Sequence, residues 1–504
     1  ADINNYWVVG HLLYGHNLSN PFPDVTRTQF LIVLGSNLTV SHGSMMTVGR
    51  VKEKLQDIVA RGGRVVVIDP RRTETAQQFE WQPLKPDGDP WLVSAMLKTL
   101  FDEQLVDTAA LREQTTGWET LPALLSGITP ERVELETGMR HTDVQQLARD
   151  FAAAPSAALY GRCGASLGPF STLTKYLIDV FNIASGRLDK RGGVVFGRPM
   201  IDIELFTKLF KADGYDRWRT RVDNFPEVLG TAPLASMPRE IRTPGKGQMR
   251  ALIVGAGNMA TTSCASDDVS AALGELDLMV SLDPYLTETN RHAHYILPPT
   301  LWIERDGMPI FTQMHNAVPH AQWVPATVQP KGEARDDWWI LDQIAKRIGL
   351  VPSALQAAQW LGKIGIRLSP GTAVDLFMRL APEGDWFGLR PKGLSRKKLY
   401  ANPGGIKLDD RVPVGVWRKR IHHRDKKIHL DHALIREEMQ RMLARPTTTG
   451  ADYPLRLISM RELQSQNSWL HNSPRLMTAN RTHRLRINPK DAEALGLNEA
   501  DQVS

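Results

Sequence analysis

Short apolar runs, each followed by glycine or aspartate, predict a first β-α-β unit. The runs "FLIVLG" (30–35) and "RVVVIDP" (64–70) are typical of strands that are buried on both faces. Between them, apolar residues recur at helical spacing from Val48 to Val59, and "RGG" then offers a glycine for a left-handed cap. Asp69 would therefore lie at the carboxyl end of a parallel strand, which is the edge where open α/β sheets bind ligands.

The same order of elements returns later in the chain. "ALIVGAGN" (251–258) matches "FLIVLGSN", and "LMVSLDP" (278–284) predicts the following strand. Between them, "SDDVSAALGEL" predicts a shorter helix with Ser266 as its N-cap. In this alignment Asn37 corresponds to Asn258. The chain therefore predicts two related α/β units.

A heptapeptide follows the second strand of each unit, as "DPRRTET" (69–75) and again as "DPYLTET" (283–289). For one copy, a structural role would suffice, because Asp-Pro starts turns and Thr-Glu-Thr can cap a helix. Core packing selects apolar character far more than it selects aspartate and threonine, so two copies in matching positions predict two half-sites. "GAGNMA" also fits a dinucleotide fingerprint, but "TTSCASDD" follows where that fingerprint requires a helix.

Composition limits the classes of protein. With 504 residues, 42% hydrophobic and 23% charged, the chain is long enough for about three domains. No run approaches the roughly 18 apolar residues that cross a bilayer, and the first residues lack a signal-peptide pattern. We expect a fragment that is open at both ends, because there is no initiator Met and "GLNEADQVS" resembles the start of a strand. The net charge of +6 suits a polyanionic ligand such as a phosphate ester.

The two cysteines and the paired strand ends narrow the chemistry. Cys163 and Cys264 provide neither a disulfide framework nor a metal cluster, and we expect each to be a small buried residue. Strand-end carboxylates can accept paired hydrogen bonds from the amidine edge of guanine, and loop N–H groups with nearby arginines can hold pyrophosphate. Two such edges would bind two nucleotide tails.

Five blocks carry a resemblance to a known family. In order, they are "LGSNLTVSHGS", "VVVIDPRRTETA", "LKPDGDPWLVSAML", "GRCGASLGPF…FNIASGRLDKRGGVVF" and "LDPYLTETNRHAHYILP…IERDG". Together they resemble the dimethyl sulfoxide reductase family of molybdenum or tungsten enzymes, which includes formate dehydrogenases and nitrate reductases. The resemblance implies an α/β fold of two pseudo-equivalent Rossmann-like parallel-sheet units. It also implies a bis(molybdopterin guanine dinucleotide) cofactor with molybdenum or tungsten.

The end of the chain is similar to the opening of the family's C-terminal β-barrel. The similarity lies in "LISMRELQSQNSWLHNSPRL" and in the following "LRINPKDAEALGLNEADQV". Within the second stretch, the local pattern predicts a strand, then a short helix that starts at Asn488-Pro489 and stops at Gly496. The barrel would be incomplete in this sequence.

The resemblance also implies site residues, and Asp89 corresponds to the family's guanine-binding acid. In the first unit the cofactor-binding residues would be Gly35, Ser36, Asn37, Asp69, Pro70, Arg71, Thr73, Asp89, Gly161 and Gly164. In the second unit they would be Gly257, Asn258, Asp283 and Thr287. In the C-terminal region they would be Arg461, Asn467, Ser468, Trp469, His471 and Asn472. The chain departs from the family pattern at Leu38, Met259, Asp87, Glu80 and His294.

The metal ligand stays open between two interpretations. In the first interpretation Asp2 is the metal ligand, because it lies in about the right place for the family's ligand and a carboxylate can bind a high-valent metal. In the second interpretation Asp2 is a solvated acid at the chain end. His11 and His16 could line the entrance, although a single histidine is more often a surface or packing residue. The family's 4Fe-4S cluster belongs to an N-terminal domain that this sequence lacks. No Cys-His pair of the formate dehydrogenase kind is present, so formate is not favoured.

These features predict the catalytic subunit of a molybdenum or tungsten oxidoreductase. Its regions would be 1–24 near the metal, 25–200 and 201–440 as the α/β units, and 445–504 as the partial barrel. We expect a small-molecule substrate, an electron-transfer partner and a cytoplasmic location. The alternatives are a non-catalytic relay subunit of the same fold, as in respiratory complex I, and an NAD-dependent dehydrogenase. The basic stretch "VWRKRIHHRDKK" could suggest nucleic acid, but we expect a connecting segment and no nucleic-acid partner.

Overall fold

The computed structural model describes residues 3–209, 211–350, 369–446, 455–465, 470–471, 473–477 and 484–503. The chain divides into two compact units, Ala1–Leu457 and Ile458–Ser504. The predicted residues Asp2, Asn467, Ser468, Trp469 and Asn472 lie outside the described residues. None of the described helices is both long enough and apolar enough to cross a membrane.

A parallel four-stranded sheet with the strand order β4-β3-β2-β6 forms the centre of the first α/β region. Its strands are β2 (Phe30–Leu34), β3 (Arg64–Ile68), β4 (Glu80–Gln82) and β6 (Ala157–Gly161). All residues of β2 and β6 are buried, as the uninterrupted apolar runs predict for strands covered on both faces. Leu34 pairs with Ile68 and with Gly161, so β2, β3 and β6 end at the same edge.

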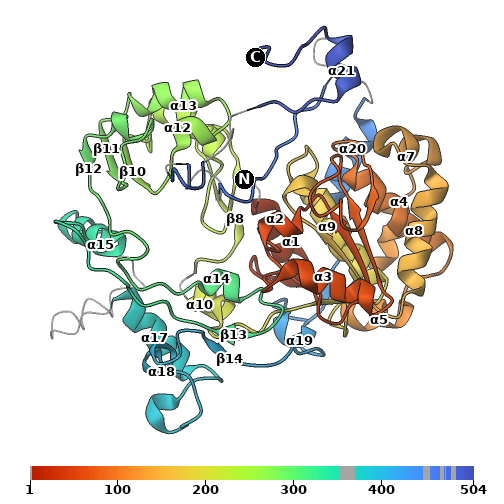
Figure 1. Ribbon diagram of the computed structural model, residues 1–504, viewed down its shortest axis with the longest axis horizontal. Helices are drawn as coiled ribbons and strands as arrows, with labels where there is room; N and C mark the ends of the chain where they lie inside the picture. Colours follow the sequence, from red (N-terminus) through yellow and green to blue (C-terminus); the bar gives the residue numbers. More distant parts are fainter. Residues whose placement is uncertain are drawn as a thin grey trace. The chain divides into compact units, whose positions relative to one another are not determined.

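Helices cover this sheet. The helix α3 packs against β3, and α9 packs against both β6 and α4. The bounds are α1 (Asn4–Tyr14), α2 (Leu38–Ser41), α3 (Val51–Ala60), α4 (Asp89–Asp102), α5 (Thr108–Gln114), α6 (Leu121–Leu124), α7 (Pro130–Thr137), α8 (His141–Ala153) and α9 (Ser171–Ala184). Figure 1 labels α3, α4, α8 and α9 among the helices of the first α/β region. The helix predicted between 48 and 59 is α3, and Gly62 after it has a φ of +79°, as expected for a left-handed helix end.

A smaller parallel sheet, β10-β11-β12, forms the second α/β region. Its strands are β10 (Ala251–Gly255), β11 (Leu278–Leu282) and β12 (Tyr295–Ile296), with the helices α11 (Met237–Arg242), α12 (Met259–Thr262) and α13 (Ser266–Leu273) beside them. Among the described residues, β10 pairs only with β11, whereas its counterpart β2 pairs on both sides. Ile253 and Leu278 are accordingly 43% and 41% exposed. The prediction of an α/β fold with parallel sheets is confirmed.

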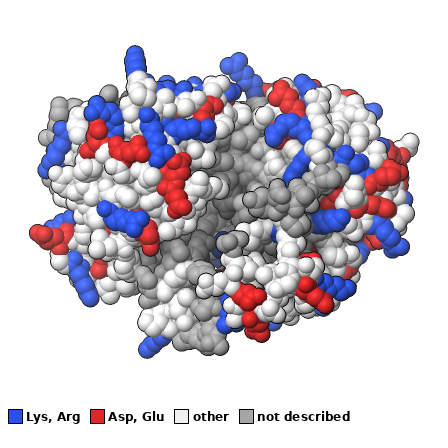
Figure 2. All heavy atoms as spheres, turned by 90° about the horizontal axis from the view of Figure 1, so that it is seen from above, with Lys and Arg blue, Asp and Glu red and all other residues white. Residues whose placement is uncertain are grey.

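The other described helices and strands lie outside these two sheets and their covering helices. They are β1 (Phe22–Pro23), β5 (Thr115–Thr116), β7 (Val194–Val195), α10 (Ile203–Leu209), β8 (Tyr215–Arg219), β9 (Pro226–Val228), α14 (Ile310–Gln313), β13 (His320–Ala321), α15 (Asp337–Arg347), α17 (Pro370–Leu380), α18 (Arg396–Tyr400), β14 (Ile406–Lys407), α19 (Trp417–Arg420), β15 (Ile428–His429), α20 (Ala433–Ala444) and α21 (Pro489–Ala494). On the face shown in Figure 2, basic and acidic side chains are interspersed.

Three local predictions can be judged from these elements. The helix predicted at Asn488-Pro489 is α21, where the Asn488 side chain accepts a hydrogen bond from the Lys490 N–H and Gly496 follows with a φ of +67°. The strand predicted just before it is wrong, because 484–488 has no regular structure. Ser266 is not the N-cap of α13 but its first helical residue, since Ala265 takes the cap position with a φ of +53°.

Candidate cofactor-binding edges of the two parallel sheets

Two glycines bring the loops after β2 and β6 into backbone contact. The Gly164 N–H donates to the Gly35 carbonyl at 2.9 Å. A Cβ on Gly35, which has a φ of +56°, would lie 2.3 Å from the Ala165 nitrogen, and a Cβ on Gly164 would lie 2.7 Å from the Gly35 oxygen. Both positions therefore require glycine, and the two loops form one closely packed edge.

At this edge, the first heptapeptide holds the loop after β2 through the side chain of Asn37. The amide and the hydroxyl of Thr75 donate to Asn37 Oδ1 at 3.2 and 2.8 Å, and Asn37 Nδ2 donates to Glu74 Oε2 at 2.6 Å. The Thr39 N–H in turn donates to Thr75 Oγ1 at 3.0 Å. One N–H of the Asn37 carboxamide is left for a ligand, and the other polar atoms fix its orientation.

The second heptapeptide makes the same contacts with Asn258. The amide and the hydroxyl of Thr289 donate to Asn258 Oδ1 at 3.2 and 2.7 Å, and Asn258 Nδ2 donates to Glu288 Oε2 at 2.7 Å. The Ala260 N–H donates to Thr289 Oγ1 at 3.0 Å. We call each of these arrangements an Asn-Thr-Glu clamp. The two half-sites predicted from sequence thus have the same geometry, at the carboxyl edges of two separate sheets.

Sequence reasoning named the asparagines and the first threonine of each heptapeptide, but it missed the Glu and Thr that complete the clamps. Thr73 and Thr287 have a local role, because their hydroxyls accept hydrogen bonds from the Ala76 and Asn290 N–H groups at 3.1 and 3.3 Å. The missed residues could have been found, because they are the last two positions of a heptapeptide whose two copies differ only at the third and fourth positions.

The aspartates that open the heptapeptides also act alike within each turn. Asp69 Oδ1 accepts from the Arg71 N–H at 3.0 Å, and Asp283 Oδ1 accepts from the Tyr285 N–H at 2.9 Å. Within the described residues, no hydrogen bond to the second carboxylate oxygen of either aspartate is found. Arg71 also forms an ion pair with Glu74 at 3.1 Å, so the first turn carries a guanidinium that the second one lacks.

A buried acid lies beside Asp69. Asp89 is the first residue of α4 and is 8% exposed. Burial raises its pKa to about 7, and the neighbouring Asp69 and Asp87 also raise it. Burial raises the pKa of Asp69 as well. Such a carboxyl group is suited to accept hydrogen bonds from neutral N–H donors, so the edge fits a nucleobase with paired donors.

Asp87, at the position where the family has glycine, adopts a left-handed conformation with a φ of +68°. Its carboxylate lies 3.8 Å from Arg445 and 3.9 Å from Arg456. The substitution therefore places a charged side chain in a conformation that glycine adopts more readily.

A buried cation, which sequence reasoning missed, lies at the end of β6. Arg162 is 7% exposed, donates to Ser44 Oγ at 2.8 Å and lies over the ring of Tyr6 at 4.9 Å. Within the described part of the chain, no carboxylate forms an ion pair with it. Its position between the strand-end glycines Gly161 and Gly164 was the available signal. An uncompensated guanidinium here favours an anionic ligand at this edge.

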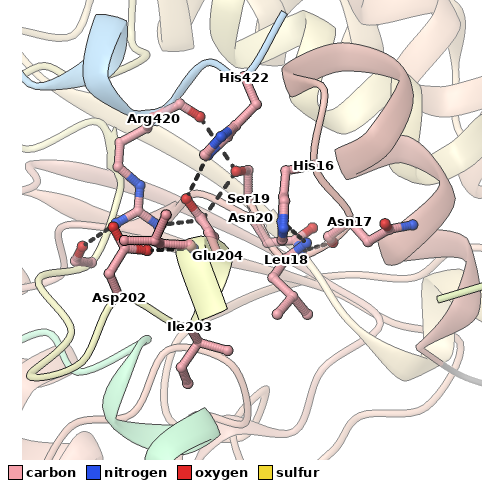
Figure 3. A network of polar contacts seen from close by, with 12 residues as sticks. His16, Asn17, Leu18, Ser19, Asn20, Asp202, Ile203, Glu204, Arg420 and His422 are labelled. Carbon is pink, nitrogen blue, oxygen red and sulfur yellow. Dashed lines mark hydrogen bonds and ion pairs between the residues drawn. The ribbon is translucent and has the colours of Figure 1, made fainter. Parts of the chain in front are cut away.

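The loop 16–20, the start of α10 (202–204) and the end of α19 with the residues after it (420–422) converge in a second polar cluster around Glu204 (Figure 3). Glu204 is 3% exposed and accepts hydrogen bonds from Arg420 at 2.5 Å, Ser19 at 3.0 Å and His422 at 2.8 Å. Burial opposes its ionisation, but Arg420 and His422 outweigh that effect and lower its pKa to about 2. This carboxylate therefore joins three distant segments of the chain.

The histidines near this cluster are packed within the protein. His16 Nδ1 accepts from the Leu18 N–H at 3.1 Å, so its Nε2–H donates to Thr207 at 3.0 Å. Burial lowers the pKa of His16 to about 4, and burial also lowers that of His11, which lies 6.2 Å from the ring of Tyr215. His16 is completely buried, so it is a packing residue and does not line an entrance.

The remaining predicted residues lie in varied surroundings. Ser36 is buried and Pro70 is exposed. A Cβ on Gly161 would lie 2.5 Å from the Ile178 side chain, whereas a Cβ on Gly257 would make ordinary van der Waals contact with the Val254 side chain at 3.7 Å. Arg461 and His471 belong to the second compact unit and are exposed. The expectation that both cysteines are buried is wrong, because Cys264 is exposed in the loop before α13 and Cys163 is only partly buried. Among the described residues, no group of three or more His, Cys, Asp or Glu is placed to hold a metal ion.

Comparison with known families matches both parts of the chain. The family model described as molybdopterin oxidoreductase matches residues 4–347, and that described as molydopterin dinucleotide binding domain matches residues 455–504. Among solved structures, the acetylene hydratase from Pelobacter acetylenicus has a TM-score of 0.65 at 18% identity, covering 98% of this chain and 69% of that one. At this identity the likeness concerns the fold alone.

Curated relatives match this chain over part of their own length. "Probable oxidoreductase YyaE" of Bacillus subtilis is 28% identical over 67% of this chain and 47% of the relative. Formate dehydrogenase H of Escherichia coli is 27% identical over 66% of this chain and 47% of the relative. The assimilatory nitrate reductase catalytic subunit of Bacillus subtilis is 24% identical over 88% and 61%. The chain thus spans about half the length of the first two of these relatives. Because the first family model covers most of the chain, the protein belongs to the molybdopterin oxidoreductase family.

Proposed function

We propose that the chain is part of the catalytic subunit of a molybdenum or tungsten oxidoreductase that binds a bis(molybdopterin guanine dinucleotide) cofactor. The observation that carries this proposal is the duplicated Asn-Thr-Glu clamp. Asn37 and Asn258 make equivalent hydrogen bonds at the carboxyl edges of two separate parallel sheets. A cofactor with two similar nucleotide tails is a ligand that needs two such edges.

In this proposal, the residues of the chain orient the cofactor. Asp69 and Asp89 accept N–H groups of the first guanine, and Asp283 has the corresponding role in the second half-site. Arg71 and the buried Arg162 offset phosphate charge at the first edge. Gly35, Gly164 and Gly257 let the backbone approach the ligand closely. When bound, the cofactor supplies two-electron redox chemistry at its metal.

Other parts of the proposal concern residues whose roles follow from the resemblance. Asp2 remains the candidate metal ligand, and His11 remains a candidate near the metal. The residues Arg461, Asn467, Ser468, Trp469, His471 and Asn472 would contact the pterin from the beginning of a C-terminal barrel. A 4Fe-4S cluster would lie in a domain outside this sequence and pass electrons to a partner protein, and we propose a cytoplasmic location.

The substrate is proposed as a small molecule. Relatives are named formate dehydrogenase, thiosulfate reductase and nitrate reductase, which are named for small anions. The sequence contains no Cys-His pair of the formate dehydrogenase kind, so we do not favour formate.

Two other functions are compatible with the fold. A non-catalytic relay subunit is disfavoured, because both half-sites keep polar clamps that such a subunit does not need. A solved structure of the same fold is named a hydratase, and hydration requires no net electron transfer. A cofactor-loaded protein that hydrates its substrate but exchanges no electrons with a redox dye would favour this second function.

Metal and nucleotide analysis tests the proposal. Acid hydrolysis of the full-length protein should release about two guanine nucleotides for each molybdenum or tungsten atom. Asp69→Ala and Asp283→Ala should each lower the nucleotide content, while the far-ultraviolet circular dichroism of the apoprotein stays unchanged. A fully folded preparation without either metal, or normal nucleotide content in both variants, would contradict the proposal.

A further inference from the structure

A short segment carries most of the net charge of the chain. Residues 417–427 ("WRKRIHHRDKK") contain six Lys and Arg side chains and one Asp, a net charge of +5, while the whole chain has +6. The rest of the chain is therefore nearly balanced, in agreement with the mixed charges on the face shown in Figure 2. The two half-sites use none of these residues, so the segment needs a separate explanation.

The backbone of this segment is held firmly against the protein. Trp417, Ile421, Ile428 and Leu430 are at most 9% exposed, and they alternate with the charged positions. The Trp417 N–H donates to the buried Asp189 at 2.7 Å, the His422 N–H donates to the Tyr14 carbonyl at 2.7 Å, and the Leu430 N–H donates to the Thr116 carbonyl at 2.9 Å. The segment is thus a fixed platform and not a loose basic tail.

The cations of this platform remain available. Arg418, Lys419, Arg424 and Lys426 are exposed. Lys427 donates to the Arg112 carbonyl at 2.8 Å, which adds the exposed end of α5 to the same surface. We call Arg112, Arg418, Lys419, Arg424, Lys426 and Lys427 the basic surface.

Little of this charge is neutralised locally. The carboxylate of Glu113 lies 3.3 Å from Arg418, and that of Asp425 lies 3.0 Å from His429. In the described part of the chain, no carboxylate forms an ion pair with Arg112, Lys419 or Arg424. Besides Arg418, Arg420 is paired, because it turns inward to Glu204 and is therefore not part of the basic surface.

We propose that the basic surface docks a soluble electron-transfer protein with an acidic face. This inference rests on the proposed function, since an oxidoreductase must exchange electrons with a partner. Complementary charges steer such encounters and raise association rates by roughly 10- to 1,000-fold. Weak redox complexes also bury little area, below about 1,200 Å², so they need no large apolar core. A rigid, strongly charged and non-apolar surface has these properties.

Other anionic partners fit the surface less well. No large apolar side chain between residues 415 and 446 is exposed, so the surface has nothing to insert into a lipid interface. Trp417 is 9% exposed, and between residues 415 and 446 no Phe, Tyr or Trp side chain is exposed for stacking with bases, as single-stranded nucleic acid would require. Charge complementarity without apolar or aromatic anchors therefore favours an acidic protein.

The experiment uses the cofactor-loaded protein and an acidic flavodoxin as the probe. Association is measured by isothermal titration calorimetry at about 50, 150 and 500 mM salt, chosen on the order of the screening range of surface charges. The triple variant Arg112→Glu, Lys419→Glu, Arg424→Glu is compared with the control Lys52→Glu, Lys392→Glu, Lys397→Glu. All six positions are exposed, and each triple variant changes the net charge from +6 to zero. Cofactor content is measured in every preparation.

We expect the first triple variant to weaken flavodoxin binding at least tenfold at the lowest salt concentration, and the control to weaken it less than threefold. Single-turnover oxidation of reduced flavodoxin, with the oxidised metal centre of the loaded protein as the electron acceptor, should slow in the first variant alone, while oxidation of a small reduced viologen dye stays unchanged. Equal weakening in both variants would overturn the proposal, as would tighter binding to a short DNA duplex or to vesicles that contain phosphatidylserine. Specific binding by protein without molybdenum or tungsten would contradict the proposed function and leave the docking surface in place.

Discussion

Replacing Asp89 by asparagine should stabilise the apoprotein and weaken cofactor binding, two effects of opposite sign. Asp89 is 8% exposed, and burial raises its pKa from 3.8 to about 7. Between these values the folded protein retains a proton that the unfolded chain releases, so the free energy of unfolding falls as pH rises from 3.8 to about 7. At about 1.4 kcal/mol for each pKa unit, the ionised group costs up to roughly 4 kcal/mol at pH 8.

The substitution Asp89→Asn removes this cost, because an asparagine side chain cannot ionise and has nearly the same shape. The same change replaces one carboxylate oxygen by an N–H donor, which would face the N–H groups of the proposed guanine. Two facing donors leave both groups without acceptors, and such a mismatch costs about 1–3 kcal/mol. A residue that serves only the fold would not show this opposition between stability and binding.

The assay combines thermal unfolding of the apoprotein at pH 5 and pH 8 with the guanine nucleotide content of the loaded protein. The melting temperature of Asp89→Asn should exceed that of the parent protein at pH 8, and the gain should be smaller at pH 5. Asp102→Asn, at the exposed end of the same helix, is the control and should change neither quantity. A less stable Asp89→Asn apoprotein at pH 8, or unchanged nucleotide content, would refute the reasoning.

Three further predictions concern the clamps, the glycine edge and the buried histidine. Thr75→Val removes a hydroxyl that contacts Asn37 and both the amide and the hydroxyl of Thr39, whereas Thr289→Val removes one that contacts only Asn258 and the Ala260 amide. Thr75→Val should therefore lower the local free energy of opening by about 2 kcal/mol and speed amide hydrogen exchange at 36–41 by about 30-fold or more, whereas Thr289→Val should have a smaller effect at 257–262. Thr75→Ser should restore protection, and equal exchange in the Ser and Val variants would argue against the clamp. Gly35→Ala should lower the free energy of unfolding by about 1–3 kcal/mol in urea titrations, because its Cβ would lie 2.3 Å from the Ala165 nitrogen. The control is Gly230→Ala, where the space is open, and an effect of Gly35→Ala no larger than that of the control would count against the close approach. Burial lowers the pKa of His16 from 6.5 to about 4, so the folded protein favours the neutral imidazole. The contribution of His16 to the free energy of unfolding is therefore complete above pH 6.5 and falls by up to roughly 3 kcal/mol as the pH drops to 4. His16→Asn, whose amide oxygen can replace Nδ1, should show a smaller loss over that range in thermal unfolding, and an identical pH profile would exclude His16 as the source.

The parts of the fold that could be predicted from sequence depend on local patterns. The uninterrupted apolar runs of β2 and β3 are buried as expected, and β11 is buried except at Leu278, because strands inside a parallel sheet have no polar face. The repeat of strand-end residues predicted that Asn37 and Asn258 have equivalent positions. Asn37 and Asn258 each lie three residues beyond the end of the first strand, and Thr75 and Thr289 each lie seven residues beyond the end of the second strand. Because the strands pair in the same register, these equal distances produce equal geometry.

What sequence reasoning missed depends on contacts between distant segments. Arg162 becomes a buried cation only because Ser44 and Tyr6 pack around it, and neither neighbour could be paired with it from spacing alone. Glu204 is similar, since its partners come from residues 16–20 and 420–422. The N-cap of α13 was misplaced by one residue, because Ala265 adopts a positive φ that its side chain does not favour.

The middle residues of the two heptapeptides show why the half-sites should not bind their ligands in the same way. At the first edge, Arg71 is held by Glu74 beside a sheet whose strand β2 is paired on both sides. At the second edge, the corresponding residue is Tyr285, which is 57% exposed, and Leu286 after it is 83% exposed. The first edge therefore offers a preformed charge for phosphate, whose contribution falls with salt. The second edge offers apolar and aromatic surface, whose contribution is largely independent of salt. If both edges hold guanine nucleotide tails, raising the ionic strength should weaken the first attachment more than the second, although the two clamps are nearly identical.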